Sequence, residues 1–142
     1  MRQTLQKILA GVLLISTVPY ASQRELDEDD MNCPDSPNCV SSLASDSAHY
    51  IAPLSFHDQP EAAMQRLRIA LLSEKRVRIV KEEANYLHAE VRSLIFRFID
   101  DVEFTLVSEQ GVFQVRSASR VGYSDFGVNR RRIERIRELF QK

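Results

Sequence analysis

Glycine and proline are scarce in this sequence, with four glycines and five prolines among 142 residues. Because hydrophobic residues make up 44% of the chain, this composition excludes a collagenous, low-complexity or disordered protein. We expect a single domain. The formal net charge of -1 also argues against a protein that binds nucleic acid or a membrane surface through its overall charge.

The apolar run at residues 8–18 is too short for a membrane-spanning helix, because it has eleven residues where about 20 are needed. Arg2 and Lys7 precede it without any acid, which is typical of a secretory signal. We therefore expect residues 1–21 to be a signal peptide and the protein to be periplasmic or otherwise exported, with an uncleaved interfacial anchor as the alternative. No cysteine directly follows the run, so it offers no acceptor thiol for lipidation.

Charge is distributed unevenly along the chain. Residues 22–64 contain one basic and nine acidic side chains, whereas residues 65–142 contain sixteen basic and eleven acidic ones. Five of the acids lie within residues 24–30, where Leu26 is the one apolar side chain. A segment of this kind cannot bury enough surface to order itself. We expect residues 22–32 to be an acidic flexible spacer before a single domain at residues 33–142.

The sequence has two cysteines, Cys33 and Cys39, separated by five residues that include two prolines. In an oxidising compartment the simplest interpretation is a disulfide within a turn-rich loop. A redox pair or half of a metal site is the alternative. Since none of the three histidines is paired with another ligand at metal-binding spacing, we predict neither a metal nor a cofactor.

Hydrophobic spacing predicts a two-layer α+β domain with the order β-α-β-β-β-β-α. We expect a short edge strand within residues 49–54 and a helix from a capping box at 58–61 to residue 73. Four strands should follow, near residues 76–79, 86–92, 101–106 and 112–119, and then a helix at 128–141. Consecutive hairpins imply an antiparallel sheet of four to five strands with both helices on one face. Residues 96–99 interrupt the alternation and indicate a bulge or bend.

The strand alternation separates an apolar from a polar face. The apolar face, expected to meet the helices, consists of Leu87, Ala89, Val91, Val102, Phe104, Leu106, Phe113 and Val115. The polar face contains Tyr86, His88, Glu90, Arg92, Asp101, Glu103, Thr105, Gln114 and Arg116. This face is either an ordinary solvated surface with ion pairs or a binding surface, in which Arg92 and Arg116 hold an anion and the three carboxylates orient them.

Arginines concentrate at the predicted junction between the last strand and the last helix, residues 116–132. The free N–H groups at a helix start could hold a carboxylate or phosphate there. In the alternative, Asp125 caps the helix and pairs with an arginine. No Gly-Lys-Ser/Thr sequence follows the glycines, which excludes a phosphate loop. The candidate binding residues of the junction are Arg116, Arg120, Tyr123, Asp125, Asn129 and Arg130.

Four segments, at residues 33–42, 89–93, 98–104 and 116–132, resemble the bacterial and plastid family called domain of unknown function number 1499. The resemblance begins at Met31 and covers nearly all of the following chain. It implies a small domain of that type but no residue roles, because the family has no established activity. The matching motif residues are Cys33, Cys39, Glu90, Arg92, Asp100, Asp101, Glu103, Arg116, Ser117, Ser119, Arg120, Gly122, Tyr123, Asp125, Asn129 and Arg130.

We predict a non-catalytic envelope module that binds an anionic ligand, a lipid headgroup or a partner protein through Arg92, Arg116, Arg120 and Arg130. We expect no nucleic-acid partner, and membrane contact only through an uncleaved leader. The alternative is a hydrolase or transferase. It would use Ser117 or Ser119 as nucleophile, with His88 as base and Asp101 as its orienting group, although no G-x-S-x-G segment occurs. A pair among Glu90, Asp101 and Glu103 acting on a glycan is a further catalytic possibility.

Overall fold

Six strands and two helices make up the part of the chain that the computed structural model describes, residues 26–142. The signal peptide expected at residues 1–21, and residues 22–25 of the expected spacer, lie outside the described residues. Within the described part no helix combines the length and apolar character needed to cross a bilayer. The elements are β1 (Cys39–Ser41), β2 (Leu54–Ser55), α1 (Pro60–Ser73), β3 (Val77–Glu83), β4 (Tyr86–Arg92), β5 (Ile99–Val107), β6 (Val112–Ser119) and α2 (Val128–Phe140).

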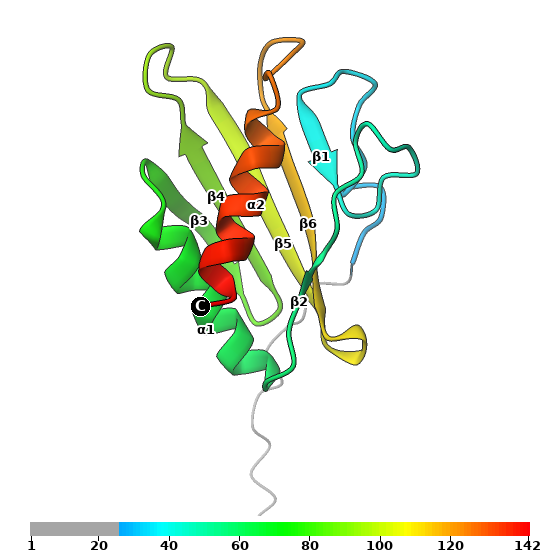
Figure 1. Ribbon diagram of the computed structural model, residues 1–142, viewed down its shortest axis with the longest axis vertical. Helices are drawn as coiled ribbons and strands as arrows, with labels where there is room; N and C mark the ends of the chain where they lie inside the picture. Colours follow the sequence, from blue (N-terminus) through cyan, green and yellow to red (C-terminus); the bar gives the residue numbers. More distant parts are fainter. Residues whose placement is uncertain (1–25) are drawn as a thin grey trace, which may run out of the picture.

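The strands form one antiparallel sheet in the order β1-β6-β5-β4-β3, and β2 pairs with the other end of β6. Both helices cover the same face of the sheet (Figure 1), which confirms the predicted two-layer α+β fold. The sheet has one strand more than the expected maximum of five. The additional strand is β1, in which Cys39 pairs with Ala118. Three residues beside a turn-rich loop are too few to show an alternating pattern.

The core lies between the sheet and the helices. All eight side chains predicted for the apolar face are buried. Among the side chains that the helices place over them are Leu67 and Leu71 from α1 and Ile133, Ile136 and Phe140 from α2. The rings of Phe113 and Phe140 meet edge to face with their centroids 5.7 Å apart. A period of two in the strands and of 3.6 in the helices therefore accounts for these core residues.

The predicted capping box at the start of α1 is wrong. Gln59 occupies the N-cap position without a side-chain hydrogen bond, and Pro60 begins the helix. The Asp58 carboxylate accepts hydrogen bonds from Arg66 instead, over 2.7 and 3.1 Å. Because proline has no N–H, its position at the first turn removes one donor that a cap would serve.

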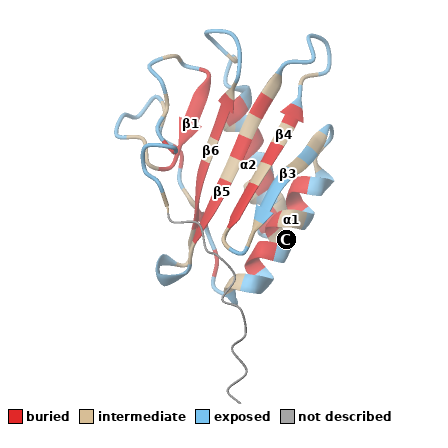
Figure 2. Ribbon diagram, turned by 180° about the vertical axis from the view of Figure 1, so that it is seen from behind, coloured by how far each residue is buried: buried red, intermediate tan, exposed pale blue. Residues whose placement is uncertain are grey.

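Two exposed loops extend from one end of the sheet, the β4–β5 loop (residues 93–98) and the β6–α2 loop (residues 120–127) (Figures 1 and 2). They share a base, because the Arg120 N–H donates to the Ile99 carbonyl over 3.0 Å. The predicted interruption at residues 96–99 corresponds to the first of these loops. Arg97 within it has a φ of 56°, in the left-handed region that residues other than glycine seldom adopt.

Candidate functional site

The start of helix α2 is occupied by a carboxylate of the chain itself. Asp125 Oδ1 accepts from the Gly127 N–H and Asp125 Oδ2 from the Asn129 N–H, both over 2.9 Å. Gly127 takes a φ of 75°, which is readily available to glycine. The structure therefore matches the prediction that Asp125 caps the helix. Its side-chain partner is Asn129, over 2.6 Å, rather than an arginine.

Asn129 is fully buried and joins three parts of the fold. Its Nδ2 donates to the Asn38 carbonyl over 3.0 Å, and to Ser119 Oγ over 3.1 Å. Its Oδ1 accepts from Ser117 Oγ over 2.5 Å. Every polar atom of this amide is thus bonded inside the protein, so Asn129, a predicted binding residue, positions the strand and the helix.

A buried ion pair continues this network. Arg132 Nη2 donates to Asp100 Oδ2 over 2.5 Å, and Nη1 donates to Asn129 Oδ1 over 2.7 Å. Both charged side chains are more than 90% buried. The free-energy cost of removing two opposite charges from water is offset when they pair with each other and are hydrogen-bonded. Arg132 belongs to the predicted basic junction, but its pairing with Asp100 was not predicted.

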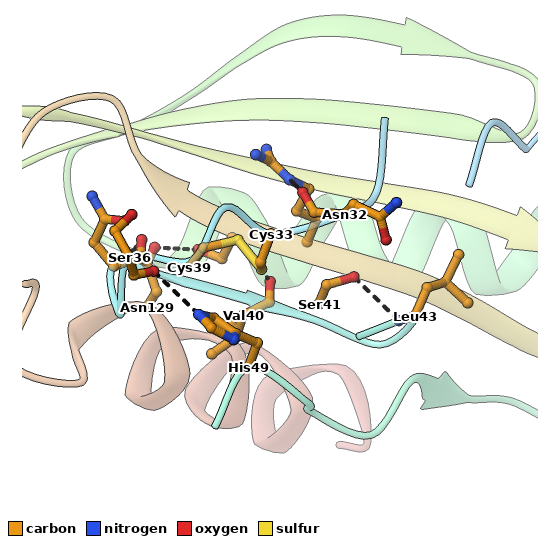
Figure 3. The surroundings of a disulfide bond; sticks show 12 residues. Asn32, Cys33, Ser36, Cys39, Val40, Ser41, Leu43, His49 and Asn129 are labelled. Atoms are coloured by element: carbon orange, nitrogen blue, oxygen red, sulfur yellow. Dashed lines mark hydrogen bonds between the residues drawn. A yellow bond between two sulfur atoms is a disulfide. The ribbon is translucent and has the colours of Figure 1, made fainter. Parts of the chain in front are cut away.

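The disulfide between Cys33 and Cys39 is present, as predicted, and its loop is held on two sides (Figure 3). The His49 ring lies between the Ser36 carbonyl, 3.2 Å from Nε2, and the Asp46 carboxylate, 2.9 Å from Nδ1. On the other side, Asn38 Nδ2 donates to the Gly122 carbonyl over 2.7 Å. The disulfide loop consequently supports the β6–α2 loop.

Arg120 binds two carboxylates on the open face of the sheet. It donates to both oxygens of Asp101 over 2.7 Å and to Glu90 Oε1 over 2.6 Å, while Arg78 donates to Glu90 Oε2 over 2.7 Å. The hydrogen bonds from Arg78 and Arg120 lower the pKa of Glu90. Burial alone would raise the pKa of Asp101, but hydrogen bonds from Arg120 and His88 outweigh it and the pKa is lowered. Both carboxylates are therefore held ionised.

The other predicted arginines of the junction also have internal partners. Arg116 donates to Glu103 over 3.2 Å and to the Asn32 carbonyl over 3.0 Å. Arg130 donates to the carbonyls of Ala48 and Tyr50 over 2.9 and 2.8 Å. Because their guanidinium groups already hold protein oxygens, these arginines fix surrounding segments of the fold.

The residues of the predicted nucleophilic site are not brought together. His88 Nε2 contacts Asp101 Oδ1 over 2.7 Å on the open face. Ser117 and Ser119 contact Asn129 of helix α2 on the opposite face of the sheet. Consecutive residues of a strand point to opposite faces of the sheet. On β6 this alternation turns Ser117 and Ser119 toward the helices, and on β4 it turns His88 toward the open face, so the sheet separates them. Glu90 and Asp101 also lack the raised pKa of a general acid, since the pKa of each is lowered.

Arg92 differs from the other predicted arginines. Within residues 26–142, Arg92 and Arg97 are the two arginines whose guanidinium groups have neither a hydrogen bond nor an ion pair. Both line one depression of about 420 Å³ at the base of the β4–β5 loop. We call this the arginine depression; its lining residues are Arg76, Val77, Arg78, Glu90, Arg92, Ser93, Leu94, Arg97 and Ile99.

Three further arginines of the depression, Arg76, Arg78 and Arg97, are not among the site residues predicted from the sequence. Arg76 lies between α1 and β3 with a φ of 60°, and its Nε donates to the Arg92 carbonyl over 3.0 Å. Pairing of β3 with β4 places Arg78 opposite Glu90. The available sequence signal was the interruption at 96–99, which contains Arg97 and follows Arg92 closely.

A larger depression, of about 680 Å³, lies toward the other end of the sheet. Its lining includes four acids, Glu61, Glu82, Glu83 and Glu109, and none of the predicted site residues. Size therefore does not identify the candidate site. The arginine depression contains two predicted residues, Arg92 and Glu90, and both unpaired guanidinium groups, those of Arg92 and Arg97.

Comparison with known proteins gives a family but no activity. No curated protein matches the sequence. The profile of the family described as "Protein of unknown function (DUF1499)" matches residues 31–140, which is more than half of the chain and agrees with the resemblance of its motifs. The match begins at Met31, a buried residue, and ends at the last residue of α2. This chain is a member of the DUF1499 family.

Proposed function

We propose that this protein is a non-catalytic binding module of the cell envelope that holds an anionic group in the arginine depression. The observation that carries the proposal is the pair Arg92 and Arg97. Their guanidinium groups are unpaired and line one depression. Every other arginine within residues 26–142 donates to a protein oxygen.

The charges around the depression favour an anion. Arg76, Arg78, Arg92 and Arg97 line it together with a single acid, Glu90. That acid is already bound by Arg78 and Arg120, so it does not neutralise the other cations. A guanidinium group presents a planar set of N–H donors that matches a phosphate or carboxylate. We therefore place the bound anion between Arg92 and Arg97.

Export also remains a proposal, and the disulfide supports it. Disulfides persist in oxidising compartments and are rare where thiols are kept reduced. Both the Cys33–Cys39 bond and the basic and apolar pattern of residues 1–21 support export to an oxidising compartment. Cell fractionation of the full chain, followed by thiol labelling without reductant, tests this. Recovery in the cytosol with two reactive thiols would refute export.

Thermal unfolding with inorganic phosphate tests the binding site. At a phosphate concentration ten times the Kd, the unfolding midpoint of the full chain should rise by about 5 °C. Phosphate also stabilises proteins non-specifically by exclusion from their surface. The comparison is therefore made between variants that lose the same charge, Arg92→Gln with Arg97→Gln and, as matched controls, Arg66→Gln and Arg68→Gln. Both control arginines are half-exposed and pair with acids that do not line the arginine depression.

The proposal requires that the Arg92→Gln/Arg97→Gln variant lose the phosphate-dependent rise beyond the non-specific effect. The Arg66→Gln/Arg68→Gln control should keep it. Equal rises in both variants would refute an anion site in the arginine depression. A fall in the midpoint without phosphate does not affect this comparison, because each variant is measured against itself.

A further inference from the structure

Apolar side chains are exposed at the two loops next to the arginine depression. In the β4–β5 loop Ile95 and Phe96 are 78% and 73% exposed, and in the β6–α2 loop Tyr123 and Phe126 are 74% and 87% exposed. Single exposed apolar residues are ordinary on protein surfaces, but a contiguous group of them marks an interaction site. The exposed apolar residues of the two loops are Leu94, Ile95, Phe96, Phe98, Val121, Tyr123 and Phe126. We call them the apolar tips.

The apolar tips form one end of the molecule. Asp100 pairs with Ser119 where β5 begins and β6 ends, so both loops leave the sheet from neighbouring strands. Figures 1 and 2 draw the two loops at the same end from opposite sides. The rings of Phe96 and Phe98 stack with centroids 5.5 Å apart, which gives the β4–β5 loop a shared apolar surface.

Charge around the apolar tips is positive. Arg92 and Arg97 flank Leu94, Ile95 and Phe96 in the sequence, and the β4–β5 loop contains no acid. The one acid of the β6–α2 loop, Asp125, is bonded to the start of α2. The end of the molecule therefore presents apolar side chains with unpaired guanidinium groups beside them.

We propose that this end docks on the surface of an anionic lipid bilayer. The apolar tips enter the boundary between headgroups and acyl chains, and a lipid phosphate occupies the arginine depression. The phosphate and acyl layers of a lipid surface provide the anionic and apolar partners side by side. This inference rests on the proposed function, for which it names the source of the anion. It departs from the sequence-based expectation that membrane contact is confined to an uncleaved leader.

A second copy of the chain fits this end less well than a lipid surface. A symmetric dimer places the same patch of both copies face to face. Arg92 and Arg97 of one copy would then approach those of the other, and like charges across an interface oppose association. Anionic lipid headgroups instead complement the two unpaired charges of each copy.

The absence of tryptophan from the sequence allows a position-specific test in the full chain. Phe96→Trp places a single tryptophan in the apolar tips. Gln110→Trp, the matched control, places it at an exposed position in the turn between β5 and β6, at the other end of those strands. Vesicles of phosphatidylglycerol and phosphatidylcholine, with bromine on the acyl chains, report contact with the bilayer by quenching. Because the tryptophans differ in position within one chain, binding through residues 1–21 does not imitate the result.

We expect quenching and a blue shift for Phe96→Trp and neither change for Gln110→Trp. In this background Arg92→Gln with Arg97→Gln should weaken vesicle binding roughly 30-fold, at about 1 kcal/mol for each cation near an anionic surface. Phe126→Ser should weaken it about tenfold. Vesicles of phosphatidylcholine alone should produce little quenching.

Three results would overturn the docking inference. The first is an unquenched Phe96→Trp variant with anionic vesicles, and the second is equal quenching with phosphatidylcholine alone. The third is a blue shift that follows protein concentration without lipid, together with a dimer in sedimentation, which would assign the apolar tips to a second copy. If any of these occurs while phosphate still raises the unfolding midpoint through Arg92 and Arg97, the docking inference fails and the proposed function stands. If the phosphate effect is absent as well, both fail.

Discussion

Asn129 of helix α2 donates a hydrogen bond to the backbone carbonyl of Asn38 over 3.0 Å, across 91 positions of the chain. Asn38 lies inside the disulfide loop, and its own amide donates to the Gly122 carbonyl. These bonds tie the disulfide loop, β6 and the start of α2 together. The arginine-rich junction at residues 116–132 therefore holds parts of the fold together. The unpaired guanidinium groups of Arg92 and Arg97 lie outside it.

Substitution of Asn129 should destabilise the fold more than its size suggests. In Asn129→Ala the buried groups that it serves, among them Ser117 Oγ and the Asn38 carbonyl, lose a partner. An unsatisfied buried group costs about 1–3 kcal/mol, so we expect a loss of about 3 kcal/mol in the free energy of unfolding. Urea titration measures it. The control Asn32→Ala removes an exposed side chain and should change the value by less than about 0.5 kcal/mol. Equal effects of the two substitutions would contradict the buried network.

The buried pair of Arg132 and Asp100 should show strong coupling. Arg132→Met leaves Asp100 as a buried carboxylate without its cation, and Asp100→Leu leaves Arg132 as a buried cation without its carboxylate. Each single variant should lose about 3–5 kcal/mol of unfolding free energy. The double variant should lose clearly less than the sum of the two. A double-mutant cycle by urea unfolding measures the coupling, and additive losses would show that the two charges do not stabilise one another.

Removal of the disulfide should lower stability modestly. The bond closes a loop with a sequence separation of six, and closure of so short a loop contributes about 2 kcal/mol. Cys33→Ser/Cys39→Ser should therefore lower the free energy of unfolding by about that amount in urea. Because the Ser119 N–H donates to the Asn38 carbonyl within the disulfide loop, amide exchange at Ser119 should also accelerate. Unchanged exchange there would show that the disulfide loop does not hold the end of β6 in place.

Stability should depend on pH through His49. The hydrogen bond with Asp46 raises the pKa of His49 above its ordinary value of 6.5, against the effect of burial, and the nearby Ser36 carbonyl and Asp35 carboxylate act in the same direction. A raised pKa stabilises the folded protein fully below about pH 6.5, and this stabilisation disappears as the pH rises through the folded-state pKa. The lowered pKa of Asp46 sets the acidic limit, since that contribution is lost as its carboxylate becomes protonated. His49→Gln should therefore lose more stability at pH 5.5 than at pH 9.

The control for this prediction is the Asp46→Asn background, which removes the carboxylate that raises the pKa of His49; there the difference between the losses caused by His49→Gln at pH 5.5 and pH 9 should largely disappear. Thermal unfolding at the two pH values measures the losses in both backgrounds. A loss in His49→Gln that is equal at pH 5.5 and pH 9 would contradict a protonated bridge between Ser36 and Asp46.

The internally bonded arginines should affect stability but not phosphate binding. Arg120→Ala leaves Glu90 and Asp101 without their shared donor, and Arg116→Ala removes the donor to Glu103. Both variants should unfold at a lower temperature than the parent. Their midpoints should nevertheless rise with phosphate as much as the parent's does. Loss of the phosphate effect in either variant would move the anion site to the junction and away from Arg92 and Arg97.

The amount of structure that could be predicted differs between core and site. The alternation of apolar and polar residues in 86–92 and 112–119 correctly predicted that Leu87, Val115 and the other apolar-face residues of these strands lie in the core. It did so because side-chain direction on a strand is a local property. Arginine density was a poor guide to the site. The guanidinium groups of Arg116, Arg120 and Arg130 find partners up to 84 residues away, and such partners cannot be read from neighbouring residues.

The sequence by itself determined the α+β class, the faces of the strands, the disulfide pair and the family, since each depends on local periodicity or on a contiguous motif. Only the tertiary structure decided which arginines are available to a ligand. Folding brings carboxylates and carbonyls to Arg116, Arg120, Arg130 and Arg132, and their bonding capacity is used there. It leaves Arg92 and Arg97 together in the lining of the arginine depression, next to the two exposed loops and without a hydrogen bond or ion pair from their guanidinium groups.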